Sequence, residues 1–257
     1  MTEPLVTETL EKGVLMLTLG AGKAHALSSA MIATLNEVLD RAGRDDAVRV
    51  IVLHGPGHIF CAGHDLKEIA RHRQDADQGE SYLRKLFEDC AEMMQRLTTG
   101  PKPTIAVVDG IATAAGAQIV AACDLAFASE RATFSLPGVN NGGFCSTPLV
   151  AVGRAISRKH AMDMALSGAS YDASWAQSVG LINRIIPSNS LMDEVQTFAA
   201  TLATRHAPAI SSGKVSFHAQ LEEPLAVAYA RAGETMLDHF MDPFRIAEEQ
   251  DSWGKGQ

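Results

Sequence analysis

KPTIAVVDGIATAAGAQIVAACDLAFAS, the stretch Lys102–Ser129, decides the fold. Within it, Thr104–Val108 is apolar and mostly β-branched, which is typical of a strand buried on both faces, and the Asp-Gly pair that follows predicts a turn. In the range Thr113–Cys123 only Thr113 and Gln118 are polar, so the composition predicts a helix that lies almost wholly inside the protein. The stretch therefore predicts a buried strand, a turn and a buried helix.

The predicted helix begins with residues that have almost no side chain, Ala114, Ala115 and Gly116. A ligand can therefore come close to the backbone N–H groups at the positive end of the helix dipole. Such donors stabilise a carbonyl oxygen as it gains negative charge, which is the arrangement of an oxyanion hole. Small residues also let a buried helix pack tightly on a sheet, and this segment alone does not separate the two interpretations.

A second segment repeats this pattern. Val48–His54 predicts another buried strand, and GPGHIFCAGHDLKEIARHR follows it. Asp65 and Glu68 have the spacing of a capping box, which predicts a helix that begins at Leu66. The preceding residues Ala62–His64 would then present backbone donors at a helix start, so two such turns can hold one carbonyl group from two sides.

These two segments resemble the enoyl-CoA hydratase/isomerase superfamily, the crotonases, through FCAGHDLKE at Phe60–Glu68 and the whole of Lys102–Ser129. The resemblance extends to TFSLPGVNNGG at Thr133–Gly143, AMDMALSG at Ala161–Gly168 and AQSVGLINRIIP at Ala176–Pro187. It implies an α/β fold, with a ββα spiral core over residues 1–200 that binds acyl-CoA. Residues 201–257 are then a helical region that builds trimers, often paired into hexamers.

The resemblance also implies roles for individual residues. The backbone N–H groups of His64 and Ala115 match the two oxyanion-hole donors that hold the thioester carbonyl of an acyl-CoA. His25 stands where the family has the Asn of an Asn-Ala-Leu motif that lines the pantetheine, and Lys23 is either a contact of a CoA phosphate or simply solvated. The residues that the resemblance places at CoA or the substrate are Lys23, His25, Ala62, Asp65, Leu66, Thr113, Gly116 and Pro137.

Two positions depart from the family pattern. A hydratase of this family uses two glutamates to activate water and deliver a proton, and these fall at Gln118 and Gly138. Neither an amide nor the hydrogen side chain of glycine acts as a general acid or base near neutral pH. We therefore expect ordinary hydration to be nearly abolished while the oxyanion hole remains. Gln118 is either the holder of a water or a small anion such as bicarbonate, or a hydrogen-bonded core residue.

Other reactive groups near the expected site are few. Cys145 and Ser146 fall about where some relatives place a further carboxylate, and neither has a base beside it in sequence. We interpret Cys145 as a small buried filler, since free cysteine is among the most buried residue types. The His64 imidazole either turns toward the acyl group or faces solvent, and we predict the solvent-facing position because only the backbone amide is required there.

Composition limits the remaining classes of function. The 257 residues carry a net charge of −8, which argues against a nucleic-acid partner. The four cysteines form no Cys-x-x-Cys pair and have no His-rich neighbourhood, so we expect no metal and a reducing compartment. No run reaches the roughly 20 apolar residues of a membrane span, and the acidic N-terminal sequence MTEPLVTETLEKG predicts neither a signal nor a transit peptide. We therefore expect a cytoplasmic protein.

The leading prediction is an enoyl-CoA hydratase/isomerase-like enzyme, a lyase or isomerase of fatty acid metabolism. It would act through a thioester enolate held by the amides of His64 and Ala115, with acyl-CoA or enoyl-CoA as substrate and no cofactor besides the coenzyme A of that substrate. The alternative is a non-catalytic acyl-CoA-binding or regulatory protein that keeps the oxyanion hole as a grip on the carbonyl group.

Overall fold

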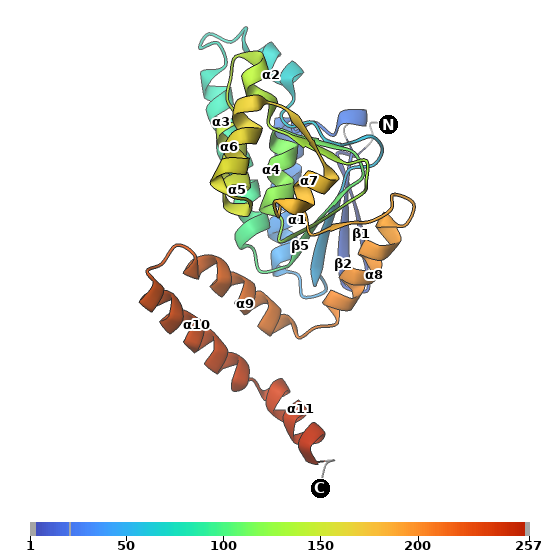
Figure 1. Cartoon of the computed structure of the whole chain (residues 1–257), viewed down its shortest axis with the longest axis vertical. Coiled ribbons are helices and arrows are strands. Elements are labelled where there is room, and N and C mark those ends of the chain that lie inside the picture. Colours follow the sequence, from blue (N-terminus) through green and yellow to red (C-terminus); the bar gives the residue numbers. More distant parts are fainter. Residues whose placement is uncertain (1–3, 21, 255–257) are drawn as a thin grey trace. The chain divides into compact units, whose positions relative to one another are not determined.

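The computed structural model describes residues 4–20 and 22–254 of the chain, and it forms two compact units, one up to Thr204 and one from Arg205 (Figure 1). The expected boundary after residue 200 falls within a helix that ends at Ala203, so the division lies slightly later.

The first unit contains two sheets, one of six strands in the order β1-β2-β3-β5-β7-β10 and one of four in the order β4-β6-β8-β9. The large sheet consists of β1 (Val6–Glu11), β2 (Val14–Leu19), β3 (Val50–His54), β5 (Thr104–Val108), β7 (Leu125–Ala128) and β10 (Arg184–Ile185). The small sheet consists of β4 (Ile59–Cys61), β6 (Ile111–Thr113), β8 (Thr133–Ser135) and β9 (Ser170–Asp172). Only the β1–β2 and β8–β9 pairs are antiparallel.

Strands alternate between the two sheets along the chain. β3, β5 and β7 lie side by side in the large sheet, and each is followed by a strand of the small sheet, β4, β6 or β8, before the chain turns into helical structure. This repeated strand–strand–helix unit is the ββα spiral that the resemblance implied. It brings the residues that follow β4 next to those that follow β6, because β4 and β6 are paired in parallel.

Helices cover both faces of the large sheet in the first unit. Their bounds are α1 (Ser29–Arg44), α2 (Leu66–His72), α3 (Glu80–Thr99), α4 (Ala115–Ala122), α5 (Ser146–Ala155), α6 (Arg158–Ser167), α7 (Ala173–Ser178) and α8 (Leu191–Ala203), with short 3-10 helices η1 (Gly22–Ala24) and η2 (Pro137–Asn141). One apolar cluster joins α1, α3 and α4 to the sheets, and a second joins α8 to the opposite face of β2, β3 and β5.

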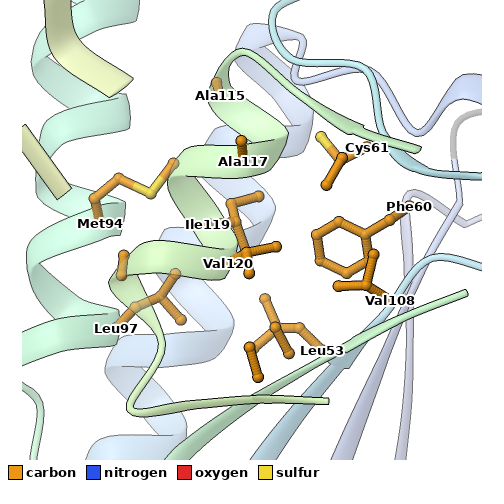
Figure 2. Close-up of a cluster of buried hydrophobic side chains, with 14 of the residues drawn as sticks. Leu53, Phe60, Cys61, Met94, Leu97, Val108, Ala115, Ala117, Ile119 and Val120 are labelled. Atoms are coloured by element: carbon orange, nitrogen blue, oxygen red, sulfur yellow. The ribbon is translucent and has the colours of Figure 1, made fainter. Parts of the chain in front are cut away.

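Helix α4 lies in the middle of the larger cluster, as its apolar composition predicted. Figure 2 shows Ile119 and Val120 of α4 pointing toward Phe60 and Val108, with α3 on the other side of the helix. All residues of α4 except Ala121 are buried. Burial of these apolar side chains is the main contribution that holds the helix in place, because each Å² of apolar surface removed from water contributes a free energy of about 25 cal/mol.

The second unit contains three helices, α9 (Ala207–Gln220), α10 (Leu225–Phe240) and α11 (Pro243–Gly254), of which α9 and α10 pack against each other. In its described part, Ala228 is the one buried apolar residue. Large apolar side chains are exposed on all three helices, namely Val215, Phe217, Leu225, Val227, Tyr229, Met236, Leu237, Phe240 and Phe244.

Several expected elements are confirmed at their bounds. β5 spans Thr104–Val108 as predicted, and the helix predicted to start at Leu66 does so. Helix α1 begins after its N-cap Ser28, which accepts a hydrogen bond from the amide of Met31. Strand β2 is not the first of the fold, because β1 precedes it as an exposed edge strand that carries little apolar signal.

Candidate active site

The first turn of α4 has an unusual backbone. Ala114, its N-cap, has φ +51° and ψ −119°, a conformation that residues with a Cβ rarely adopt. Its N–H donates to the carbonyl of Ser135, which ties the turn to β8. A Cβ on Gly116 would lie 2.1 Å from the carbonyl oxygen of Cys61, so only glycine lets α4 approach β4 this closely.

The turn between β4 and α2 is held by a second set of backbone bonds. Leu27 donates its N–H to the carbonyl of Gly63 at 2.8 Å and accepts from the N–H of Asp65 at 3.1 Å, so Leu27 and His64 pair like neighbouring strand residues. Gly63 has φ +83°, which favours glycine. The result is a fixed turn at which the amide of His64 is presented.

The two turns lie in direct contact. A Cβ on Gly63 would be 3.0 Å from the Cβ of Ala114 and 3.1 Å from the amide nitrogen of Ala115. The amides of Ala114 and Asp65 have backbone acceptors, whereas within residues 4–20 and 22–254 the N–H groups of His64 and Ala115 donate to no backbone or side-chain acceptor. Two unpaired amides therefore stand close together, which is uncommon because buried N–H groups are nearly always paired.

The start of α2 is fixed by Asp65, as predicted, but not through a full capping box. The Asp65 carboxylate accepts from the amides of Lys67 and Glu68, at 2.9 and 3.2 Å. The Glu68 carboxylate does not return to the amide of Asp65, which is bonded to Leu27. It accepts instead from the amide of Ser29 at 2.9 Å and so joins α2 to the first turn of α1.

The residues expected at CoA lie around these turns. His25 is buried, with Nδ1 2.6 Å from the carbonyl oxygen of Gly20 and Nε2 2.9 Å from that of Pro56, so it ties two loops together. The amide of Ala62 donates to the carbonyl of Ala24 in η1, which joins the loop of Lys23 to the turn of Ala62–His64. Leu66 is 70% exposed at the start of α2, and Lys23 is exposed on η1.

Gln118 lies one turn after the unpaired amide of Ala115. Its side chain is 4% exposed, and its Oε1 has no hydrogen-bond partner among the described residues. Side chains of a helix lean toward its N-terminus, so this amide lies over the first turn of α4, on the side away from Gly116 and β4. The side-chain oxygen of Gln118 therefore does not fit the alternative of a hydrogen-bonded core residue.

Gly138 is packed against the cysteine that we interpreted as a filler. A Cβ on Gly138 would lie 2.8 Å from the amide nitrogen and 3.1 Å from the Sγ of Cys145, and the Gly138 N–H points at that sulfur, 3.3 Å away. Cys145 is 8% exposed, and burial raises the pKa of its thiol. The backbone and thiol of Cys145 thus fill the space where a longer side chain at position 138 would begin.

Thr113 and Pro137 connect the segment around Gly138 to the turn at the start of α4. The Ser135 hydroxyl donates to Thr113 Oγ1 at 2.8 Å, across the paired strands β8 and β6, and Pro137 then opens η2, which contains Gly138. Ser135 therefore fixes both the backbone of Ala114 and the side chain of Thr113. Sequence patterns had not singled it out, since a single serine at a strand end carries no distinct signal.

The prediction that the His64 side chain faces solvent is wrong. The ring lies edge-on to Phe87 of α3, with centroids 5.5 Å apart, and its Nε2 is buried without a hydrogen-bond partner among the described residues. Burial lowers the pKa of this imidazole. Phe87 was missed together with α3, although Leu86, Cys90, Met93 and Leu97 have the spacing of a helix face.

The described part of the chain contains no group of three His, Cys, Asp or Glu residues that could hold a metal ion. Nor does it contain a helix long and apolar enough to cross a membrane.

Residues 9–252 match the family model described as enoyl-CoA hydratase/isomerase. A rat protein named enoyl-CoA hydratase domain-containing protein 3, mitochondrial, is 38% identical over 241 residues, which cover 93% of this chain and 78% of the relative. A solved enoyl-CoA hydratase/isomerase family protein from Silicibacter pomeroyi is 54% identical with a TM-score of 0.89, and covers 93% of this chain and 100% of its own. Human enoyl-CoA hydratase domain-containing protein 3 is 33% identical with a TM-score of 0.91, at 98% of both chains.

Proposed function

Because the chain belongs to the enoyl-CoA hydratase/isomerase family, we propose that it binds acyl-CoA thioesters and stabilises their enolate form between the amides of His64 and Ala115. The observation that carries this proposal is the pair of unpaired N–H groups on two turns in contact. A thioester oxygen satisfies both donors at once, and each such donor is worth roughly 10²–10³ in rate when the oxygen gains charge.

The chemistry we propose is an enolate reaction rather than hydration with two carboxylates. By the resemblance, those carboxylates fall at Gln118 and Gly138, and Cys145 fills the space beside Gly138. The unpaired Oε1 of Gln118 supports the binding of a water or a polar group of the substrate at that place. We propose no cofactor besides the coenzyme A of the substrate.

The experiment that tests whether these two amides bind the thioester carbonyl compares two ligands that differ in that group. Butyryl-CoA carries a thioester carbonyl, and S-butyl-CoA is the thioether without it. We expect butyryl-CoA to raise the melting temperature more, because a ligand that binds only the folded state stabilises it by mass action. We also expect Ala115→Pro, which removes one N–H in the first turn of α4, to abolish the difference. Equal shifts for the two ligands would contradict the proposal.

The second candidate is a non-catalytic acyl-CoA-binding or regulatory protein. It is favoured by the missing carboxylates at positions 118 and 138, since general acid–base groups contribute about 10²–10⁴ to rate. The enzyme and the non-catalytic binder would both bind the thioester carbonyl at the two amides, and they differ in whether the thioester is turned over. Exchange of the thioester α protons with solvent, followed by NMR in D₂O, separates them, because a protein that only binds leaves these protons in place.

We further propose that residues 205–254 associate with other copies of the chain as a homotrimer or hexamer. The support is the set of exposed apolar side chains on α9, α10 and α11, which leaves this unit with little core of its own. Light scattering after size-exclusion chromatography measures the mass, and a monomer at micromolar concentration would contradict the proposal.

For location, we propose the cytoplasm, because the cysteines of the described residues form no disulfide. The rat relative is named as mitochondrial, so fractionation of the expressing cells has to distinguish the two compartments.

A further inference from the structure

The ring of His25 is buried between two loops, and both of its nitrogens face acceptors. Its Nδ1 lies 2.6 Å from the carbonyl oxygen of Gly20, and its Nε2 lies 2.9 Å from that of Pro56. A neutral imidazole has one N–H and one lone pair, and a lone pair that faces a carbonyl oxygen is repelled. Both distances therefore fit a ring that is protonated on both nitrogens and donates two hydrogen bonds.

The two acceptor carbonyls belong to loops that are packed against other backbone. A Cβ on Gly20 would lie 2.2 Å from the carbonyl oxygen of Pro4. Gly55 precedes Pro56, and a Cβ on it would lie 2.1 Å from the carbonyl oxygen of Phe60. Such close approach leaves little room for either carbonyl group to turn away from the ring.

A second histidine, His54 at the end of β3, senses the charge of His25. Burial is the main cause that lowers the pKa of His54, and the charge of His25 acts in the same direction, against the opposing effects of Val107 and Asp109. The Nδ1 of His54 is buried without a partner among the described residues. Because like charges disfavour each other, His54 is the neutral member of this pair, and the geometry assigns the positive charge to His25.

Other titratable groups on the elements beside His25 are few. They are Lys23 of η1, His58 of the loop after β3, and Cys61 of β4, whose thiol pKa is raised by burial to about 12. Lys23 and His58 are exposed, and neither β2 nor the first turn of α1 contributes a titratable group. None of these described segments contains a carboxylate. The second ring proton of His25 therefore depends on the two backbone carbonyls.

The backbone on both sides of His25 holds the turn between β4 and α2. The carbonyl of Ala24 accepts from the amide of Ala62 at 3.0 Å. The amide of Leu27 donates to the carbonyl of Gly63 at 2.8 Å. His25 itself has φ +45°, a conformation that persists only where the surroundings impose it. The two bonds of the ring supply that constraint, so they also fix the backbone that holds the turn.

We propose that His25 is a positioning residue which, in its doubly protonated form, keeps the turn between β4 and α2 in the arrangement that binds CoA thioesters. At higher pH one ring proton passes to solvent, and repulsion between lone pairs replaces one of the two hydrogen bonds. The segment around His25 then holds the turn less firmly, so the affinity for the thioester falls as the pH rises. This inference rests on the proposed function, because the turn presents the amide of His64 to the thioester carbonyl.

The protonation state is measured by NMR on the full chain without ligand. In protein labelled with ¹⁵N-histidine, we expect nearly equal shifts for the two ring nitrogens of His25 at about pH 7, as in an imidazolium, and separate shifts at higher pH. The spectrum of His25→Asn identifies these signals. The backbone amide signals of Ala62 and Leu27 should change over the same pH range as the ring. Widely separated ring shifts at about pH 7, or amide signals that do not follow the ring, would overturn the inference.

The effect on binding is measured by calorimetric titration with butyryl-CoA between about pH 6.5 and 9. We expect the affinity of the native chain to fall by up to about tenfold per pH unit once the ring loses its proton, since only the protonated fraction binds tightly. His25→Asn carries an amide that does not titrate, so its affinity should stay nearly constant. His58→Asn, a change at an exposed histidine of the loop that contains Pro56, is the matched control and should keep the native profile.

The two levels of the argument fail in different ways. A native pH profile in a folded His25→Asn variant would overturn the role of His25. An absence of butyryl-CoA binding at every pH would overturn the proposed function and the effect on affinity with it, whereas the ring and amide signals test the state of His25 without any ligand.

Discussion

The backbone of Gly63 lies against the amide of Ala115, so closely that a Cβ on Gly63 would be 3.1 Å from that nitrogen. This contact sets the two unpaired amides beside each other, although their segments are far apart in the chain. Glycine is required at position 63 for two reasons, the positive φ of +83° and the proximity of Ala114.

Replacement of Gly63 by alanine should therefore disturb both stability and binding. We expect Gly63→Ala to lower the free energy of unfolding by about 1–3 kcal/mol, measured by urea titration, and to weaken butyryl-CoA binding. Gly57→Ala is the matched control, because Gly57 has φ +86° but no atom within 4 Å of the added Cβ. Equal losses in the two variants would mean that the positive φ alone matters.

Replacement of Ala114 by glycine should stabilise the protein. Its φ of +51° and ψ of −119° are strained for a residue with a Cβ, and glycine adopts them freely. We expect Ala114→Gly to raise the free energy of unfolding by about 1 kcal/mol or less, since glycine also adds entropy to the unfolded chain. Ala117→Gly in the interior of α4 serves as the comparison and should destabilise. A loss of stability in Ala114→Gly would show that this backbone is not strained.

A side chain at position 138 is sterically opposed. Since a Cβ on Gly138 meets the backbone of Cys145 at 2.8 Å, we expect Gly138→Ala to destabilise by about 1–3 kcal/mol. Gly143→Ala is the control, because the added Cβ meets only an ordinary contact at 3.6 Å and Gly143 has no positive φ. Unfolding in urea gives both values, and a neutral Gly138→Ala would show that the loop yields easily.

The double variant with glutamate at positions 118 and 138 should not become an efficient hydratase. Gln118→Glu together with Gly138→Glu places a carboxylate at each of these two positions, but the contact of position 138 with Cys145 predicts a displaced loop. We therefore expect little hydration of crotonyl-CoA from this double variant, measured by loss of the enoyl absorbance. Strong hydration by the native chain would contradict the view that the missing carboxylates exclude this reaction.

Stability should fall in mild acid because of two partly buried histidines, His54 and His64. Burial lowers the pKa of His54 and of His64 below the value near 6.5 of the unfolded chain. As the pH falls through about 6.5, the unfolded chain binds protons that the folded chain does not, so the free energy of unfolding decreases until the lowered pKa values are passed. Urea titrations at about pH 7.5 and 5 measure this, and His64→Gln should reduce the difference. An unchanged difference would mean that His64 titrates normally in the folded protein.

Much of the fold could be predicted because its signals are local. The apolar runs of Thr104–Val108 and Val48–His54 require burial wherever they lie, and Asp65 caps a helix through bonds to residues two and three positions away. Strand β1 was not predicted because its residues after Val6 are exposed, so its apolar pattern is weak. Helix α3 was missed although Leu86, Cys90, Met93 and Leu97 have the spacing of a helix face.

The sequence by itself determined the family, the central helix α4 and the absence of glutamate at positions 118 and 138, because these follow from residue types and their order. Only the tertiary structure decided which amides are unpaired, where the His64 ring points and what fills the space beside Gly138. Each of these depends on contacts between segments brought together by the parallel pairing of strands. Such contacts are set by packing of the whole core, and no local pattern of residues records them.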